Sequence, residues 1–417
     1  MSSETYWRRR IFAVTWLTYA GFYLCRKNFA VAMPILAGEG STKLDFTTVI
    51  FVFSLFYACG QFTNALLSDR FGARLVVGIG MMVSAASTFV MGFAGALTTF
   101  TLLAVFNGLG QSTGWSGLVK TMASWFRSRE RGIVMGWWGT SFALGGSFAS
   151  LFAVFWIGNE WFLVSAGWRR LFFFPALALA AIAVLFLILV RNRPADVGLD
   201  ALDGETSPSA STTTSLLRST LAEPALWAIA AMYFFLKSTR YAFIFWLPLY
   251  LSEALGYSFE EAGYTSTLYE LVGFSGAIFA GYVSDKLLGS RRFPVGSVML
   301  LALALVLFLH PMFASAGPFA VAVWISLVGF LTYGPDSLMS GAAAQDVGGG
   351  SATAAGIVNG VGSIGQMLSP LIVGYVAHVY GWDRVFSLFV FFALAGAGIL
   401  GTQWNYRPRE MTESVAA

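Results

Sequence analysis

Long uninterrupted runs of hydrophobic residues dominate the chain, and short polar stretches separate them. Crossing the apolar core of a bilayer takes about 20 helical residues. Twelve runs reach this scale, at residues 11–36, 47–67, 75–96, 98–120, 133–156, 169–190, 225–252, 262–284, 293–314, 318–344, 352–379 and 383–404. The runs are continuous and do not alternate between polar and apolar positions, which excludes a closed barrel. We therefore predict an all-α membrane protein with twelve transmembrane helices.

The composition agrees with this prediction. Hydrophobic residues make up 57% of the 417 positions and charged residues only 11%, whereas about 25% of a typical soluble domain is charged. No cleavage site for a signal peptide follows the first hydrophobic run, so we expect this run to be retained as a span. The two cysteines, Cys25 and Cys59, both fall in predicted spans and indicate no disulfide.

The basic residues predict an orientation, because Lys and Arg concentrate in cytoplasmic loops. Of the 25 basic residues, sixteen fall in the terminal segments and the loops after even-numbered spans, and four fall in the opposite loops. Both termini are therefore expected in the cytoplasm, and the short loops favour a bacterial inner (plasma) membrane. The net charge of +4 mainly reflects this bias and gives no indication of a nucleic-acid partner.

A polar segment divides the chain. Residues 191–224 are rich in Ser, Thr, Pro and Gly, which predicts a flexible cytoplasmic linker. The linker separates two expected six-helix bundles, residues 1–190 and 225–405, and residues 406–417 are expected to form a cytoplasmic tail.

The two halves repeat each other. "SDRFGAR" (68–74) ends the second span and "SDKLLGSRR" (284–292) ends the eighth. "GWRR" (167–170) opens the sixth span and "GWDR" (381–384) opens the twelfth. Matches in register with equivalent spans indicate a duplication, and transporters built from such repeats bind substrate near the bilayer midplane.

Each half carries cations inside its first span. Tyr19, Tyr23 and Arg26 share one helix face, because they are spaced by four and three residues. The equivalent residues of the second half, 214 positions later, are Tyr233, Lys237 and Arg240. If the halves are related by a pseudo-two-fold axis, the two arginines face each other across a central cavity.

Two guanidinium groups that face each other repel unless an anion neutralises them. Guanidinium binds phosphate through a planar fork of donors, so we interpret Arg26 and Arg240 as a phosphate clamp. Two alternatives stay open: a buried structural ion pair, with Glu270 or Asp336 as the candidate carboxylates, and cations that extend to the membrane interface.

Several further motifs are specific. They are "RKNFAVAMP" (26–34), "NGLGQSTGW" (107–115), "WFRSRERG" (125–132), "RPADVGL" (193–199), "TRYAFIFWLPLYL" (239–251), "LYELVGF" (268–274) and "TYGPDSLM" (332–339). Together they resemble the major facilitator superfamily and, within it, the organophosphate:phosphate antiporters, over nearly the whole chain. The resemblance implies two pseudo-symmetric six-helix bundles, a monomer without cofactor or metal, and exchange of a phosphate ester for inorganic phosphate.

The resemblance also implies roles for single residues. It assigns phosphate binding to Arg26 and Arg240, and places a glutamate of the family at Glu270. The tyrosines that would line the same cavity are Tyr19, Tyr23, Tyr57 and Tyr333. Asn107 and Gln111 either line the cavity or make interhelical hydrogen bonds, and the sequence does not decide between these. The cytoplasmic loops expected to stabilise one conformation contain Asp69, Arg70, Arg74, Asp285 and Lys286.

The chain departs from the glycerol-phosphate carriers at four positions. Gln61 replaces a lysine, Phe142 a histidine, Phe245 an aspartate and Lys237 a tyrosine. We hypothesise that Lys237 takes over part of the anion-binding role that Gln61 cannot fill. The phenylalanines indicate either weaker proton-linked or salt-bridge control, or a less polar organic moiety on the substrate, and they count against glycerol phosphate.

The expected mechanism is alternating access, in which the empty carrier holds both arginines unpaired and only the loaded carrier reorients. Two other functions stay open: a membrane sensor of the same fold that binds a sugar phosphate, and a carrier of non-phosphorylated organic anions. An enzyme is not expected. The two histidines, His310 and His378, lie far apart in the sequence, and the chain has no motif for a nucleotide-binding loop.

Overall fold

The computed structural model describes residues 3–159, 162–200, 221–347 and 352–406. Most of the expected linker and nearly all of the expected tail lie outside these ranges. The chain divides into two units. The first consists of residues 1–206 with 245–267, and the second of residues 207–244 with 268–417.

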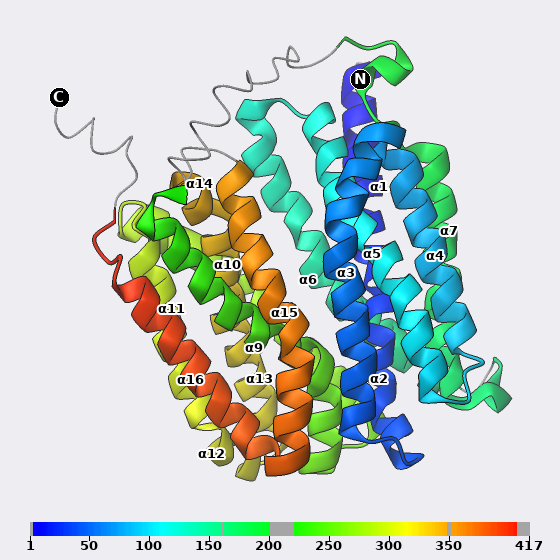
Figure 1. Ribbon diagram of the computed structural model, residues 1–417, viewed down its shortest axis with the longest axis vertical. Helices are drawn as coiled ribbons and strands as arrows, with labels where there is room; N and C mark the ends of the chain where they lie inside the picture. Colours follow the sequence, from blue (N-terminus) through cyan, green and yellow to red (C-terminus); the bar gives the residue numbers. More distant parts are fainter. Residues whose placement is uncertain (1–2, 160–161, 201–220, 348–351, 407–417) are drawn as a thin grey trace. The chain divides into compact units, whose positions relative to one another are not determined.

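The first unit contains the helices of the N-terminal half. They are α1 (Ser3–Phe22), α2 (Leu24–Gly38), α3 (Lys43–Phe71), α4 (Ala73–Met91), α5 (Leu97–Trp125), α6 (Ser128–Gly158), the 3₁₀ helix η1 (Val164–Arg169), α7 (Arg170–Leu189) and the 3₁₀ helix η2 (Pro194–Val197). Helix α5 packs against α3 and α4 (Figure 1). The backbones of α5 and α3 approach closely at Gly108, where an added Cβ would lie 2.5 Å from the carbonyl oxygen of Phe53.

The second unit contains most of the C-terminal helices. They are the π-helical η3 (Val283–Leu287), α11 (Arg292–Phe308), α12 (His310–Ser315), α13 (Pro318–Ser337), the π-helical η4 (Leu338–Ala343), α14 (Ala344–Val347), α15 (Ala352–Tyr380) and α16 (Trp382–Gly401). Helix α11 packs against α13 and α16. Helices α9 (Pro224–Leu255) and α10 (Phe259–Tyr282) contribute to both units.

Each expected span coincides with one helix or with two consecutive helices, except the tenth, which covers α13, η4 and the first residue of α14. The first span is not the single helix expected, because it breaks at Tyr23, and the ninth breaks at Leu309, two residues before Pro311. Proline explains the second break, since it has no backbone N–H to donate. The first break has no proline and instead belongs to the polar site described below.

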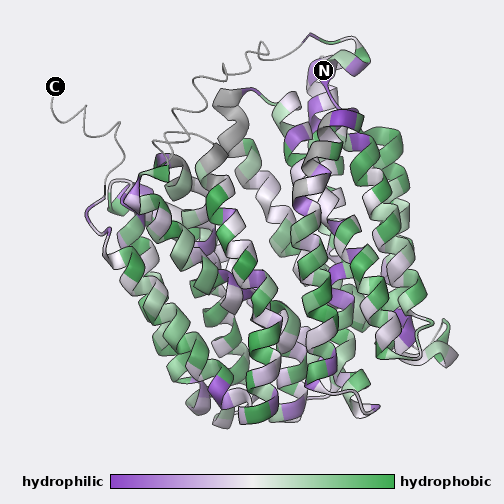
Figure 2. Ribbon diagram, viewed as in Figure 1, coloured by the Kyte–Doolittle hydropathy of each residue, from purple (hydrophilic) through white to green (hydrophobic). Residues whose placement is uncertain are grey.

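Seven helical stretches among the described residues are long and apolar enough to span a membrane. They are Lys43–Gln61, Ala73–Met91, Trp137–Gly158, Val164–Leu189, Pro318–Gly341, Gly356–Tyr380 and Trp382–Gly401. Hydrophobic residues cover most of α4, α11 and α16 in Figure 2. The long helices α5, α9 and α10 do not meet this measure, and these three carry buried polar side chains that lower their hydropathy.

Candidate anion-binding site

At the break at Tyr23, the backbone carbonyl of Phe22, in the interior of the first unit, loses its regular helical donor, the N–H of Arg26. This N–H donates instead to the carbonyl oxygen of Tyr23, three residues back, at 3.1 Å. A buried carbonyl that loses its helical partner needs another donor. The side-chain amide of Gln111 donates to the carbonyl oxygen of Phe22 at 3.0 Å. The oxygen of the same amide accepts a hydrogen bond from Arg26 Nε at 2.8 Å, so Gln111 joins the helix break to the guanidinium.

Asn107, one turn earlier on α5, makes a second link. Its Nδ2 donates to the carbonyl oxygen of Cys25 at 2.9 Å. Its Oδ1 accepts from the Ser84 hydroxyl on α4 at 2.6 Å. The sequence left open whether Asn107 and Gln111 line the cavity or make interhelical hydrogen bonds. In the structure both make interhelical hydrogen bonds, and Gln111 also contacts Arg26.

Tyrosine rings cover the Arg26 guanidinium. Its Cζ lies 4.7 Å from the ring centre of Tyr23 and 4.9 Å from that of Tyr57 on α3. Arg26 is only 4% exposed, and a cation over a tyrosine face gains more when it is shielded from water. The two rings and the Gln111 amide therefore hold the guanidinium in a fixed orientation.

Arg240 on α9 has a carboxylate partner in the second unit. Its Nη1 lies 2.8 Å from Oδ2 of Asp336 on α13, and the two side chains are 8% and 4% exposed. The ring centre of Tyr333, one turn before Asp336, lies 4.5 Å from Arg240 Cζ. The expectation that the empty carrier holds both arginines unpaired is therefore wrong for Arg240. The sequence named Asp336 as a candidate carboxylate, but spacing along the chain cannot show which neighbouring helix face an arginine meets.

Lys237 lies one turn before Arg240 and is also buried. Its Nζ lies 5.1 Å from the ring centre of Tyr233 and 3.5 Å from Oδ1 of Asn359 on α15. The charges of Asp336 and Arg240 both act on the ammonium group of Lys237. Lys237 thus belongs to the same polar cluster as Arg240, and its anion-binding role stays a prediction.

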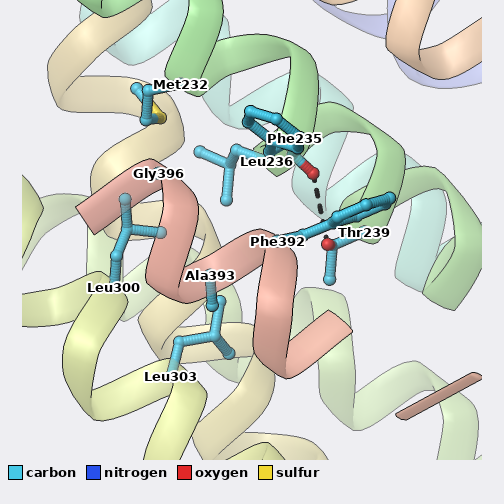
Figure 3. A pocket seen from close by; sticks show the side chains of 9 residues that line it. All are labelled: Met232, Phe235, Leu236, Thr239, Leu300, Leu303, Phe392, Ala393 and Gly396. Atoms are coloured by element: carbon cyan, nitrogen blue, oxygen red, sulfur yellow. Dashed lines mark hydrogen bonds between the residues drawn. The ribbon is translucent and has the colours of Figure 1, made fainter. Parts of the chain in front are cut away.

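Another face of α9 is apolar. Together with residues of α11 and α16 it lines the small recess drawn in Figure 3, formed by Met232, Phe235, Leu236, Thr239, Leu300, Leu303, Phe392, Ala393 and Gly396. The Thr239 hydroxyl donates to the carbonyl oxygen of Phe235 in its own helix at 3.2 Å. The recess leaves no space for a water molecule, so this face contributes to the packing of the second unit.

The remaining predicted residues have different surroundings. Glu270 on α10 is completely buried, and Gln61 on α3 is partly buried. The Tyr19 ring packs in an aromatic cluster, with ring centres 5.5 Å from Trp115 and 5.2 Å from Trp138.

The two phenylalanines that replace ionisable residues contact apolar side chains in the first unit. Phe142 packs at the edge of the hydrophobic core of this unit. The Phe245 ring lies edge-on to Phe53, with ring centres 6.3 Å apart. Both positions are therefore filled by apolar packing among the described residues.

The loop arginines of the first unit bind uncharged groups. Arg74 Nε donates to the carbonyl oxygen of Leu187 at 2.7 Å, and its backbone N–H donates to Oδ1 of Asn192 at 2.8 Å. Arg70 lies over the ring of Phe71, with Cζ 5.3 Å from the ring centre. The side chain of Asp69 lies outside the described part of the chain.

The corresponding loop of the second unit contains an ion-pair network. Arg292 contacts the carboxylate of Asp285 and, through Nε, Oδ2 of Asp346 at 3.1 Å. Lys286 is exposed. Arg292 and Asp346 were not among the predicted loop residues. Arg292 stands in the quoted motif "SDKLLGSRR", whereas nothing in the sequence singles out Asp346.

Comparisons with known proteins agree with this picture. The sequence pattern of the Major Facilitator Superfamily matches residues 15–353. The chain is 30% identical to the glycerol-3-phosphate transporter of Bacillus subtilis (strain 168), covering 95% of this chain and 92% of that protein. It is also 30% identical to the membrane sensor protein UhpC of Salmonella typhimurium, covering 98% and 94%. Among solved structures, a bacterial homolog of the human lysosomal transporter Spinster aligns with a TM-score of 0.79 at 17% identity, covering 95% and 97% of the two chains.

Proposed function

The chain belongs to the Major Facilitator Superfamily, and on this premise we propose that it exchanges an organophosphate for inorganic phosphate by alternating access. Membership confirms the predicted all-α, multi-pass membrane fold and makes the chain a transport protein rather than an enzyme. One observation carries the proposal: buried arginines at equivalent positions of the repeat, each with tyrosine ring centres 4.5–4.9 Å from its Cζ.

The chemistry of these groups suits a phosphate moiety. The fork of a guanidinium matches two phosphate oxygens, and the interaction strengthens where water is excluded. In the proposed complex Arg26 and Arg240 bind the phosphate from the two halves, Lys237 contributes a further positive charge, and tyrosine hydroxyls donate to the remaining oxygens. Inorganic phosphate presents the same head group, so it competes for the same residues and serves as the counter-substrate.

Binding and reorientation are coupled through charge. Phosphate reaches Arg26 without displacing the neutral amide of Gln111, whereas at Arg240 it competes with the Asp336 carboxylate. A substrate shifts the equilibrium between conformations only by its difference in affinity for them. The anion supplies this difference, because it gains contacts with both arginines only in the closed conformation. The cytoplasmic contacts of Arg74 and Arg292 contribute to the stability of one conformation.

The proposed setting is the inner membrane of a bacterium, with the carrier acting as a monomer. The distribution of basic residues supports cytoplasmic positions for both termini. The apolar side chains of Phe142 and Phe245 count against glycerol phosphate as the transported ester.

A second candidate function is that of a phosphate-ester sensor. It is favoured by one observation: the identity and coverage against the sensor protein are as high as against the transporter. A sensor needs the same binding residues but no flux, so a transport measurement separates the two.

Reconstituted protein tests the proposal. Purified protein in phosphate-loaded liposomes should take up radiolabelled phosphate, and a panel of organophosphates should inhibit uptake from outside and replace phosphate inside. Arg26→Lys and Arg240→Lys keep the charge but lose the fork, so uptake should fall about 10- to 100-fold. The control is Arg170→Lys, a buried arginine that instead donates to the backbone carbonyls of Ile157 and Gly167. Its uptake per folded protein should not change.

The outcomes separate the candidates. Phosphate flux that persists in both site variants contradicts the clamp. Absence of flux in the wild type, together with phosphate binding that both site variants lose, contradicts the exchanger and establishes the sensor. Neither flux nor phosphate binding contradicts both functions.

A further inference from the structure

Buried charge is distributed differently in the two units. Among the described residues, the buried charged side chains of the first unit are all cations: Arg26, Lys27 and Arg170. Those of the second unit are two cations and two carboxylates: Lys237, Arg240, Glu270 and Asp336. The second unit is therefore formally balanced before any substrate binds.

Asp336 occupies a phosphate-like position at Arg240. Its Oδ2 accepts from Nη1 at 2.8 Å, which is the distance expected for a charge-assisted hydrogen bond. Both side chains are more than nine-tenths buried, so water screens the pair weakly. The carboxylate thus supplies in the second unit the negative charge that a bound phosphate would supply.

This pair changes what the empty carrier can do. Strict exchange requires that the carrier without substrate does not reorient, and the expected obstacle is repulsion between two uncompensated arginines. We propose that Asp336 takes the place of phosphate at Arg240, so that the carrier also reorients empty and catalyses net transport of phosphate in addition to exchange. This inference rests on the proposed function.

The size of the electrostatic obstacle to reorientation follows from Coulomb's law. A repulsive energy of about 1.4 kcal/mol, the order that Coulomb's law gives for two charges shielded from bulk water, slows a closing step by about tenfold. Neutralising one of them removes most of this obstacle. We therefore expect net phosphate entry within about threefold of the exchange rate, rather than about tenfold below it.

The experiment compares two kinds of liposome. Radiolabelled inorganic phosphate is offered outside, and the vesicles contain either phosphate or chloride at equal ionic strength. Potassium on both sides with valinomycin prevents a membrane potential, which would stop net entry of charge and imitate strict exchange. The quantity measured is the ratio of initial uptake into chloride vesicles to uptake into phosphate vesicles.

Asp336→Asn is the informative variant. It gives Arg240 an amide partner, as Gln111 gives Arg26, and so keeps a hydrogen-bond acceptor while removing the charge. Its ratio should fall about tenfold, because internal phosphate still neutralises Arg240 but chloride vesicles offer no such anion. Asp45→Asn is the matched control, since it makes the same change at a carboxylate of the first unit that accepts from the backbone N–H of Thr42 rather than from an arginine. Its ratio should equal that of the wild type.

The wild type alone can overturn the inference. Uptake into phosphate vesicles without uptake into chloride vesicles leaves the exchanger intact and contradicts net transport. The inference also fails if Asp336→Asn leaves the ratio unchanged. Absence of wild-type uptake into both kinds of vesicle instead contradicts the proposed function itself.

Discussion

Arg26 and Arg240 occupy equivalent positions of the repeat but have different partners. Arg26 donates to the neutral amide of Gln111 on α5, the fourth expected span. Arg240 donates to the carboxylate of Asp336 on α13, the tenth expected span. Each arginine is also covered by tyrosine. The duplicated geometry is thus kept in both units while the charge of the partner differs.

This difference separates two tasks that a partner performs. An amide acceptor orients a guanidinium and leaves its charge available to an incoming anion. A carboxylate orients it and neutralises it as well, so an anion has to compete. The first unit therefore presents a ready anion-binding cation, and the second presents one that is already compensated.

The largest expected effect comes from removing the carboxylate without replacement. Asp336→Leu leaves Arg240 buried without its counter-charge, and breaking a buried pair in this way costs about 3–5 kcal/mol. We expect the free energy of unfolding, measured by denaturant titration in detergent, to fall by this amount. Added phosphate should restore part of it, because phosphate then neutralises Arg240. A fall below 1 kcal/mol would show that the pair is not a stabilising element of the second unit.

The equivalent change in the first unit should cost less. Gln111→Leu removes the acceptor of Arg26 Nε and the donor to the carbonyl oxygen of Phe22. It also removes the donation from Gln111 Nε2 to the Ser84 hydroxyl at 3.3 Å. Three buried hydrogen bonds are lost but no counter-charge is removed, so the free energy of unfolding should fall by about 2–3 kcal/mol. The same titration measures it. A cost equal to that of Asp336→Leu would contradict the distinction between orienting and neutralising partners.

The helices and both arginines could be predicted from the sequence, because hydrophobic run length and the repeat offset are local signals. The partners could not. Asp336 pairs with Arg240 across 96 positions of sequence, and which faces of α9 and α13 meet depends on packing. The break at Tyr23 was also missed, since no proline lies near it and Gly21, two residues before it, is one of many glycines in the predicted spans. Its stability depends on Gln111, 85 positions away from Arg26.

Lys237 also bears on this comparison, because it is the second buried cation of the unit whose buried charges are formally balanced. If it binds phosphate, Lys237→Gln should weaken phosphate affinity about three- to tenfold, which corresponds to the loss of about one hydrogen bond. Binding of radiolabelled phosphate to purified protein measures this. Arg240→Gln is the control and should abolish binding. Unchanged affinity in Lys237→Gln, beside lost affinity in Arg240→Gln, would end the hypothesis that Lys237 replaces the missing lysine at Gln61.

The smallest expected effect lies in the loops that are expected on the cytoplasmic side, where the same contrast recurs. Arg292 pairs with Asp285, which is 53% exposed, and with Asp346, whereas Arg74 donates to a backbone carbonyl. Ion pairs near water contribute about 0.2–1 kcal/mol and are screened by salt. Arg292→Gln should therefore lower the free energy of unfolding by less than about 1 kcal/mol, and roughly 1 M salt should remove most of the difference.

Arg74→Gln provides the matched comparison in the first unit. It removes donors to the carbonyl oxygen of Leu187, a neutral acceptor whose hydrogen bond salt does not screen in the same way. Its cost should be about 1 kcal/mol and equal at low and high salt. Equal salt dependence in the two variants would mean that the loops do not share the division seen at the buried arginines. If only Arg292→Gln shows a salt-dependent cost, the loops follow the same division as the buried arginines. The first half then orients its arginines, and the second half neutralises them.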